Sequence, residues 1–412
     1  DAGAYSRSAP LKGAEAFHNG EADSVEGIKV LDDYTVEFTL EEPNASFLAQ
    51  TFIGVLPEHI LGDVSPSEWA KHDFNRAPIG TGPFKFVKSE PGQFIELAAN
   101  PDYFKGAPKL AGVIVRFGDQ NTMLAAFMNQ EIDIVPVPVA EVANVESLDF
   151  AAVKTSNDLS VYYVGFNMLN EHFQDVRVRQ ALAHAVDKDL IVNSILGSFG
   201  YVLDDLFPQA HWSYNPDVTK YPYDLAKAQS LLEEAGYTKN SSGTYEKDGK
   251  PLSFTIEVPT GKLEREKTSV MLQQMWSELG VQVEILQLDF PTLVTKLLPQ
   301  DNEGKQRKVT AEDYDAYILG FGVEADPDEY RPYFHTEFMP PNGYNFVSYS
   351  DPEMDALLEQ QLVETDPAVR AETFHQIGQK LSDDVPWIAL YGQNSVFVSN
   401  TRVSGFEPDF RG

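Results

Sequence analysis

The stretch from Leu159 to Ile191 constrains the fold more than any other part of this chain, because it joins a long apolar strand directly to a helix. Its first part, VYYVGF at residues 161–166, is too apolar for a strand with one face in water, so we expect burial on both faces. Asn167 ends this run, and Asp175 is a candidate N-cap. The next apolar residues recur at helical spacing, at Val178, Leu182, Ala185 and Val186. A buried strand that ends in polar residues before a helix predicts one wall of a ligand site.

The bulk composition sets wider limits. A chain of 412 residues is too long for one core, so we expect two lobes. The 63 acidic and 31 basic residues give a net charge of −32, which repels phosphate backbones and argues against nucleic-acid binding. No cysteine is present, which excludes disulfides and thiolate metal sites. No window is apolar over the roughly 18 residues that a membrane span needs. The start, DAGAYSRS, resembles neither an initiator methionine nor a targeting segment, so we interpret the chain as a piece of a mature protein.

The first half of the chain reads as strands with turns and one longer helix. Alternating residues predict a hairpin in the first of these segments, and Pro91-Gly92 separates two further strands. The order strand, helix, strand in the last three segments predicts a mixed or parallel sheet. The predicted strands are 27–40 (the hairpin), 84–87, 94–97, 112–117 and 131–135, and the helix is 121–129. The motif Gly80-Thr81-Gly82 is followed by proline rather than a helix, so a tight turn is favoured over a phosphate-binding loop.

The second half alternates helices and strands, which predicts a second α/β lobe. Three helices begin at an aspartate N-cap, Asp224, Asp351 or Asp366, and the latter two have proline at the next position. A further helix, 265–279, ends at Gly280. The predicted strands are 252–258, 281–288, 317–321, 387–391 and 395–399. Phe374, Ile377 and Leu381 form the buried stripe of the last helix.

Six motifs in one order resemble the extracytoplasmic solute-binding proteins of family 5, the peptide-, dipeptide- and nickel-binding receptors of ATP-driven ABC importers. They are IGTGPFKF, NPDYFKGAPKL, DVRVRQALAHAVDKDLI, YPYDLAKAQSLLEEAGY, LQQMWSELGVQVEI and ADPDEY with NGYNFVSYSDPEMDALL. The resemblance implies an α/β, two-lobe Venus-flytrap fold, periplasmic-binding-protein-like, type II, of the large peptide-binding subclass. Its implied divisions are 1–76 (the rest of a small extra subdomain), 77–165 (lobe 1), 166–390 (lobe 2) and 391–412 (return to lobe 1). Full members carry on the order of a hundred more residues before the segment matching 27–40, so an N-terminal part is expected to be missing.

The resemblance also implies an acidic anchor for the ligand's α-amino group. Peptide-binding members place an acid just before the Asp-Pro of the segment matching GFGVEADPDEY. Glu324 is the nearest match, although Val323 stands where the acid is common. A carboxylate in a closed cleft favours an ammonium partner, whereas a solvated loop acid is the structural alternative. Asp326 fits a helix cap with Pro327 at N1, and ligand contact is its second interpretation.

The remaining candidates are aromatic and amide side chains. Trp212 and Tyr214 lie in a loop without helical periodicity, which suits stacking at a cleft, with a core role as the alternative. His211 precedes them. The resemblance places the hinge between the lobes at Asn167 and Met168 and gives Asn345 a role toward the peptide backbone. Phe321 and Tyr344, from the same motifs as Glu324 and Asn345, complete the predicted ligand-binding set.

Charge and spacing limit the other kinds of site. Lys262, Arg265 and Arg331 are the basic candidates for a ligand carboxylate, with surface charge as the alternative. The eight histidines show no tight metal-ligand spacing, so no metal site and no cofactor are predicted, and no G-x-S-x-G elbow is present.

We therefore predict a monomeric, non-enzymatic, extracytoplasmic receptor, periplasmic or a cell-surface lipoprotein. It closes around a short peptide by hinge bending and presents the peptide to a membrane permease. The alternatives are a receptor for a nickel chelate or an oligosaccharide, a peptide hydrolase that uses the acidic cleft, and a peptide sensor.

Overall fold

A computed structural model describes residues 10–51, 54–156 and 159–409, and its contacts divide the chain into two compact units. The large unit comprises residues 1–51, 155–395 and 408–412, and the small unit comprises residues 52–154 and 396–407. The chain therefore passes from one unit to the other after residues 51, 154, 395 and 407.

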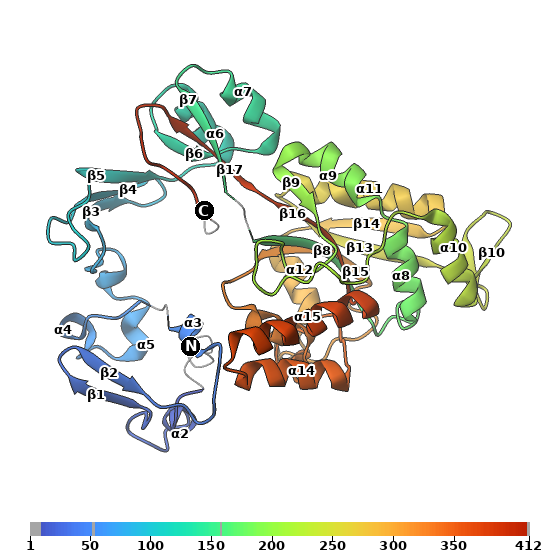
Figure 1. Cartoon of the computed structure of the whole chain (residues 1–412), viewed down its shortest axis with the longest axis horizontal. Helices are drawn as coiled ribbons and strands as arrows, with labels where there is room; N and C mark the ends of the chain where they lie inside the picture. Colours follow the sequence, from blue (N-terminus) through green and yellow to red (C-terminus); the bar gives the residue numbers. More distant parts are fainter. Residues whose placement is uncertain (1–9, 52–53, 157–158, 410–412) are drawn as a thin grey trace. The chain divides into compact units, whose positions relative to one another are not determined.

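A six-stranded sheet, in the order β14-β13-β15-β8-β16-β9, forms the centre of the large unit (Figure 1). Strands β13 (Ser253–Pro259), β14 (Gln282–Leu288) and β15 (Ala316–Gly322) are parallel. Strand β8 (Ser160–Phe166) runs antiparallel to β15 and to β16 (Trp387–Gln393), and β9 (Gly200–Val202) runs antiparallel to β16. Because β16 is therefore parallel to β13 and β15, the carboxyl ends of these strands share one edge with the start of β8. We call this edge the carboxyl edge.

The predicted central strand is confirmed. Strand β8 has a hydrogen-bonded neighbour on each side, and Val161, Val164 and Phe166 are fully buried. The helix after it, α8 (Val176–His184), begins at Asp175, whose carboxylate accepts the amide of Arg177 at 3.0 Å. The sequence therefore identified both the strand and its cap.

The helices of the large unit begin and end largely where the sequence indicates. Asp224, Asp351 and Asp366 each accept first-turn amides, and Gly280 ends α11 with φ at 103°. The helices are α2 (Ala14–His18), α3 (Phe47–Gln50), α9 (Lys188–Ile195), α10 (Leu225–Glu234), α11 (Leu263–Leu279), α12 (Phe290–Leu297), α13 (Arg331–Phe334), α14 (Pro352–Val363) and α15 (Pro367–Asp384). Short 3-10 turns are η3 (Gly197–Phe199), η4 (Pro327–Tyr330) and η5 (Thr336–Phe338), and small strands are β1 (Ile28–Asp32), β2 (Thr35–Phe38), β10 (Thr238–Lys239), β11 (Tyr245–Lys247) and β12 (Lys250–Pro251).

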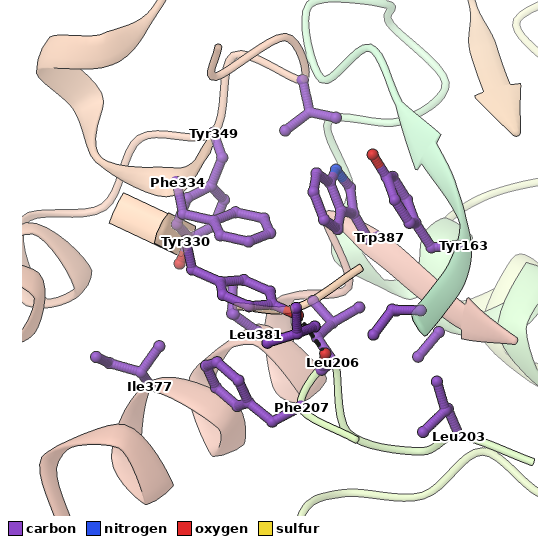
Figure 2. Packing of buried hydrophobic residues seen from close by; sticks show 14 of the residues in the cluster. Tyr163, Leu203, Leu206, Phe207, Tyr330, Phe334, Tyr349, Ile377, Leu381 and Trp387 are labelled. Atoms are coloured by element: carbon purple, nitrogen blue, oxygen red, sulfur yellow. Dashed lines mark hydrogen bonds between the residues drawn. The ribbon is translucent and has the colours of Figure 1, made fainter. Parts of the chain in front are cut away.

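An aromatic core fills one face of the central sheet (Figure 2). Tyr163 of β8 stacks on Trp387 of β16 with ring centroids 3.7 Å apart. Phe334 packs against the same tryptophan at 4.6 Å, and Tyr330 packs against Phe207 at 4.5 Å. The predicted stripe of α15 is confirmed, since Phe374, Ile377 and Leu381 are buried in this core. The core therefore joins the sheet to the loops that follow β9 and β15.

The opposite face of the sheet is covered by α11, which contacts β13, β14 and β15, and by α9, which contacts β9 and β16. Trp276 of α11 is fully buried, and its indole nitrogen donates to the carbonyl of Leu182 in α8 at 3.0 Å. Arginines at the start of a helix oppose its dipole, so the sequence predicts carboxylate partners for Arg177 and Arg179 at the start of α8. Arg177 pairs with Asp175 at 2.6 Å, as expected. The prediction was wrong for Arg179, which is 3% exposed and donates to the main-chain carbonyls of Phe173, Asp384 and Val385.

The small unit contains two three-stranded sheets and short helices. Strands β3 (Phe84–Glu90), β4 (Phe94–Ala99) and β5 (Gly112–Arg116) form one antiparallel sheet, as the turn residues predicted. Strands β6 (Ile134–Pro136), β17 (Ser395–Asn400) and β7 (Ala151–Ser156) form the other, with β6 antiparallel to β17. The helices are α4 (Glu58–Leu61), α5 (Pro66–Trp69), α6 (Gln120–Met128) and α7 (Val142–Glu146), with 3-10 turns η1 (Asp73–Asn75) and η2 (Val139–Glu141).

The mixed or parallel sheet predicted from the order of β5, α6 and β6 was wrong, because β5 and β6 belong to different sheets. The chain-terminal strand β17 pairs with β6 instead, at Val398 opposite Val135. Among residues 10–51, 54–156 and 159–409, no helix is long and apolar enough to cross a membrane.

Candidate functional site

Two loops of the large unit meet at the carboxyl edge. One follows β9 and carries His211 and Trp212, and the other follows β15 and carries Glu324 to Asp326. The amide of Val323 donates to the carbonyl of Leu159 at 2.7 Å, which fixes the second loop to the start of β8. A cavity of about 550 Å³ opens between these loops, within the size range of ligand pockets. It is lined by Thr155, Ser156, Leu159, Ala210, His211, Trp212, Ala325, Pro408 and Asp409.

The loop that carries His211 and Trp212 is organised by a buried carboxylate. Asp205 is fully buried and accepts the amides of Asn215 at 2.8 Å and Phe207 at 3.2 Å. Burial raises the pKa of Asp205 to about 7, against the effect of these amides, which lower it. Gly378 of α15 permits the approach, because a Cβ there would lie 3.0 Å from an Asp205 oxygen. Asp205 therefore holds together the two ends of the loop that carries His211 and Trp212.

His211 and Trp212 tie the two loops to each other. The indole nitrogen of Trp212 donates to the carbonyl of Ala325 at 3.0 Å, and His211 Nε2 lies 3.0 Å from the carbonyl of Glu324. A carbonyl only accepts, so His211 carries its proton on Nε2, and Nδ1 accepts from Ser213 Oγ at 2.7 Å. Burial lowers the pKa of His211, which keeps the ring neutral. Because both ring nitrogens make hydrogen bonds within the protein, His211 supports the cavity wall. Neither nitrogen is free to bind a metal ion.

Asp326 and Arg370 form the support behind this wall. The Arg370 guanidinium donates to both Asp326 oxygens, at 2.7 and 2.8 Å, and to the side-chain oxygen of Gln361 at 2.9 Å. Asp326 also accepts the amide of Asp328 at 3.0 Å, which confirms its expected role as the cap of η4. The same guanidinium lies 5.5 Å from the Trp212 ring, within cation–π range. Asp326 therefore acts on the cavity through Arg370 and Trp212.

Two acids lie at the end of β15, where one was predicted. The side chain of Glu324 is exposed, and its amide donates to a carboxylate oxygen of Glu329. Burial, together with the nearby charges of Glu324 and Asp326, raises the pKa of Glu329 to about 8, against the effect of this amide bond, which lowers it. A cation placed beside Glu329 would restore its negative charge. The end of the strand therefore offers an exposed and a half-buried carboxyl group.

The predicted aromatic residues divide between wall and core. Trp212 is 43% exposed and lines the cavity, whereas Tyr214 is half-buried in the same loop. Burial raises the pKa of Tyr214. Phe321 packs on the aromatic core and stacks on Tyr333 at 5.7 Å, and Tyr344 lies 6.0 Å from Tyr333 on the outside. These rings form a continuous half-exposed path from the core to the surface.

The predicted amide residues are occupied within the protein. Asn167 is fully buried, and its side-chain nitrogen donates to the carbonyls of Thr310 and Tyr314 at 2.8 Å. Asn345 is also fully buried and bonds the main chain of His335 and Tyr349. Met168 is partly buried on the aromatic core. None of these side chains lines the cavity, so ligand contact at Asn167, Met168 and Asn345 stays a prediction without geometric support.

Reasoning from the sequence missed Arg370, Glu329 and the wall residue Leu159. Leu159 begins the buried strand, and its position at the carboxyl edge follows once the strand order is known. Arg370 lies within a helix far along the chain from Asp326, so no local pattern connects the two. In the part of the chain that the structure describes, no group of three or more histidine, aspartate or glutamate side chains could hold a metal ion.

The comparisons with known proteins agree with each other. The sequence profile of the bacterial extracellular solute-binding proteins, family 5 Middle, matches residues 2–338. The oligopeptide-binding protein AppA of Bacillus subtilis (strain 168) is 31% identical over 411 residues, which are 98% of this chain and 74% of that protein. Its structure in complex with a nonapeptide matches with a TM-score of 0.75 over 93% of this chain and 75% of that one, at 31% identity. NikZ from Campylobacter jejuni in complex with Ni(L-His) matches with a TM-score of 0.80 at 26% identity, over 98% of this chain and 79% of that one.

Proposed function

The chain belongs to the bacterial extracellular solute-binding proteins of family 5, and from this membership we propose that it is the receptor of an ABC importer that captures a short peptide for the membrane permease. The similarity to an oligopeptide-binding protein supports a peptide as the solute. The cavity at the carboxyl edge is the observation that carries the proposal, because ligands of open α/β sheets bind outside the carboxyl ends of the strands.

The cavity wall suits an apolar or aromatic side chain of the peptide. Leu159, Ala210, Ala325 and Pro408 supply apolar surface, and the exposed ring of Trp212 supplies a face for stacking. The position of the Trp212 ring is fixed by its hydrogen bond to the carbonyl of Ala325 and by the guanidinium of Arg370 behind the ring. Little reorganisation is then needed when a ligand side chain enters, which favours affinity.

The α-amino group of the peptide is assigned to the acids at the end of β15. Glu324 is exposed and can turn toward a ligand, while Glu329 is half-buried and gains most from a cationic partner. The predicted anchor Glu324 is therefore extended to a pair of carboxyl groups. The affinities of Glu324→Gln and Glu329→Gln for free and N-acetylated peptides show which of the two acids binds the α-amino group. The variant that no longer prefers the free peptide identifies that acid.

The proposed receptor is extracytoplasmic, monomeric and without catalytic activity, and ligand capture shifts it from a more open to a more compact form. The neutral, fully bonded His211 leaves this wall without a free imidazole, which argues against a hydrolase that would use this histidine as its general base. Steady release of amino groups from peptides by the purified protein would support the hydrolase alternative.

Native mass spectrometry tests the choice of solute. We expect protein species heavier by the mass of short peptides after incubation with a peptide pool. Adducts of a nickel–amino-acid chelate or of an oligosaccharide, in the absence of peptide adducts, would replace the peptide with the alternative solute. Small-angle scattering with and without peptides tests the compaction.

A further inference from the structure

Asp205 is a buried carboxylate that bonds only neutral groups within the described residues. It is fully buried, and its two oxygens accept the amides of Phe207 at 3.2 Å and Asn215 at 2.8 Å. The ammonium group of Lys188, which lies beside this position, donates instead to the adjacent carboxylate of Asp204 at 3.2 Å. A buried acid without a cationic partner is more easily protonated than a paired one, so the charge of Asp205 is not fixed by an ion pair.

The two amides that Asp205 accepts lie at opposite ends of the loop 205–215, whose middle lines the cavity. Oδ1 accepts from Phe207 and Oδ2 accepts from Asn215, and Ala210, His211 and Trp212 lie between these residues. The ionised carboxylate accepts at both oxygens, whereas a protonated carboxyl group carries a hydrogen on one of them. That hydrogen would face an amide hydrogen, so protonation removes one of the two bonds. The charge of Asp205 therefore decides whether both ends of the loop are held.

The other contacts of this loop do not depend on the charge of Asp205. The hydroxyl of Tyr330 donates to the carbonyl of Leu206 at 2.5 Å (Figure 2). The side-chain amide of Asn215 donates to the carbonyl of His375 in α15 at 3.0 Å. These bonds keep the loop on the core when Asp205 is protonated, so the expected change is a local loosening of the cavity wall rather than unfolding.

Titratable and charged groups lie on every element around Asp205. They are Asp204 and Tyr214 of the same loop, Lys188 of α9, Glu329 and Tyr330 of η4, and His375 of α15. Burial raises the pKa of both tyrosines, so their hydroxyls stay neutral. The ring of His375 lies 3.7 Å from Glu372 on its own helix. Glu329 and His375 are therefore the groups whose titration an experiment on Asp205 has to separate.

We propose that Asp205 is a positioning residue for the ligand: its ionised form holds the loop 205–215 in the binding arrangement, and its protonated form loosens it. The inference rests on the proposed function and adds that capture of a peptide against Trp212 releases a proton from Asp205. A ligand that binds the ordered loop better favours the ionised form, so affinity rises with pH. Since burial raises the pKa of Asp205 to about 7, both forms are present near neutral pH.

Calorimetry of the intact protein with one short peptide that carries an aromatic side chain tests the proposal. Asp205→Asn keeps one oxygen for one loop amide and turns an N–H group toward the other, so it imitates the protonated acid at every pH. Titrations at pH about 7, in two buffers of different ionisation enthalpy, count the protons released. We expect the wild type to release about a quarter of a proton more than Asp205→Asn, which corresponds to a fall of about half a unit in the pKa of Asp205 on binding. Between about pH 8 and about pH 6, the wild type should lose about two- to threefold more affinity than the variant.

The comparison between the two proteins isolates Asp205, because Glu329 and the amino group of the peptide are the same in both. His375→Gln is the matched control, since it removes a titratable ring beside the loop and keeps the main-chain carbonyl that holds Asn215. It should release as many protons as the wild type.

A second measurement needs no variant. Hydrogen exchange of the ligand-free wild type, corrected for the intrinsic pH dependence of exchange, should show lower protection of residues 206–215 at about pH 6 than at about pH 8, with α11 unchanged. Unchanged protection of this loop, or equal proton release by the wild type and a folded Asp205→Asn, would overturn the role of Asp205 while leaving peptide binding intact. If the peptide binds the wild type at no pH, the proposed function fails and this inference fails with it.

Discussion

The ion pair between Asp326 and Arg370 yields the sharpest prediction, because Asp326→Asn removes the negative charge and keeps an oxygen that can cap η4. The side chains are 14% and 8% exposed, and two bonds of 2.7 and 2.8 Å join them. Removal of one partner from a buried pair costs about 3–5 kcal/mol, and the contacts of Arg370 with Gln361 place this case near about 3 kcal/mol. Asparagine retains the oxygen that caps η4, whereas Asp326→Ala loses it and should cost about 1 kcal/mol more.

Denaturant unfolding followed by tryptophan fluorescence measures these costs, since Trp212, Trp276 and Trp387 all lie in the large unit. A double-mutant cycle with Arg370→Met should give a coupling of at least about 2 kcal/mol, because the double variant leaves no buried charge unpaired. Asp289→Asn serves as the control. Asp289 caps α12 through Thr292 at 2.8 Å and makes no ion pair within the described residues, so the loss of its exposed charge should leave the stability nearly unchanged. A coupling below about 0.5 kcal/mol would refute the reasoning.

Three further predictions follow from the site and its helix. Trp212→Ala should weaken peptide binding about tenfold or more by calorimetry, whereas Trp212→Phe should retain most of the affinity; equal affinity of all three proteins would remove Trp212 from the site. The pKa of Glu329 is about 8 in the folded protein and 4.5 ordinarily, so the folded protein holds one more proton than the unfolded chain between these pH values. The free energy of unfolding should therefore fall as pH rises from 4.5 to about 8, and Glu329→Gln should flatten this dependence. An unchanged slope in the variant would contradict the assignment. Arg179→Met should destabilise the protein more than Arg177→Met and leave peptide affinity unchanged, because Arg179 is buried on main-chain carbonyls; lost affinity at an unchanged melting temperature would move the site onto α8.

Local patterns were sufficient for several elements of both units. Continuous apolar character identified β8, since only a central strand buries both faces, and aspartate followed by proline identified the starts of α14 and α15. The hairpin β1–β2 and the sheet β3-β4-β5 followed from turn residues. In each case the signal and the structure lie within a few residues of one another.

The errors come from pairings between distant segments. Strand β6 pairs with β17, which is more than two hundred residues later, so the local order of β5, α6 and β6 gave the wrong sheet. Arg179 was expected to pair with a carboxylate, but it donates to the carbonyls of Phe173, Asp384 and Val385.

The candidate site shows the same limit. His211 and Trp212 were predicted and line the cavity, but Arg370 and Glu329 become visible only when the loops after β9 and β15 are brought together. The amide of Asn345 can hydrogen-bond a peptide backbone, but it is buried and donates to main-chain carbonyls of the turn at residues 335–349. Sequence patterns identify chemistry, and the fold decides whether that chemistry faces a ligand.

The central claim is that the large unit binds a peptide side chain against Trp212 and Ala325. Hydrogen–deuterium exchange of the intact protein, with and without a pool of short peptides, tests it most directly, because ligand contact slows exchange of the amides it covers. We predict that peptides protect the loops 208–215 and 323–326, which contain these two residues. Protection confined to other segments, or none with any peptide pool, would contradict the assignment.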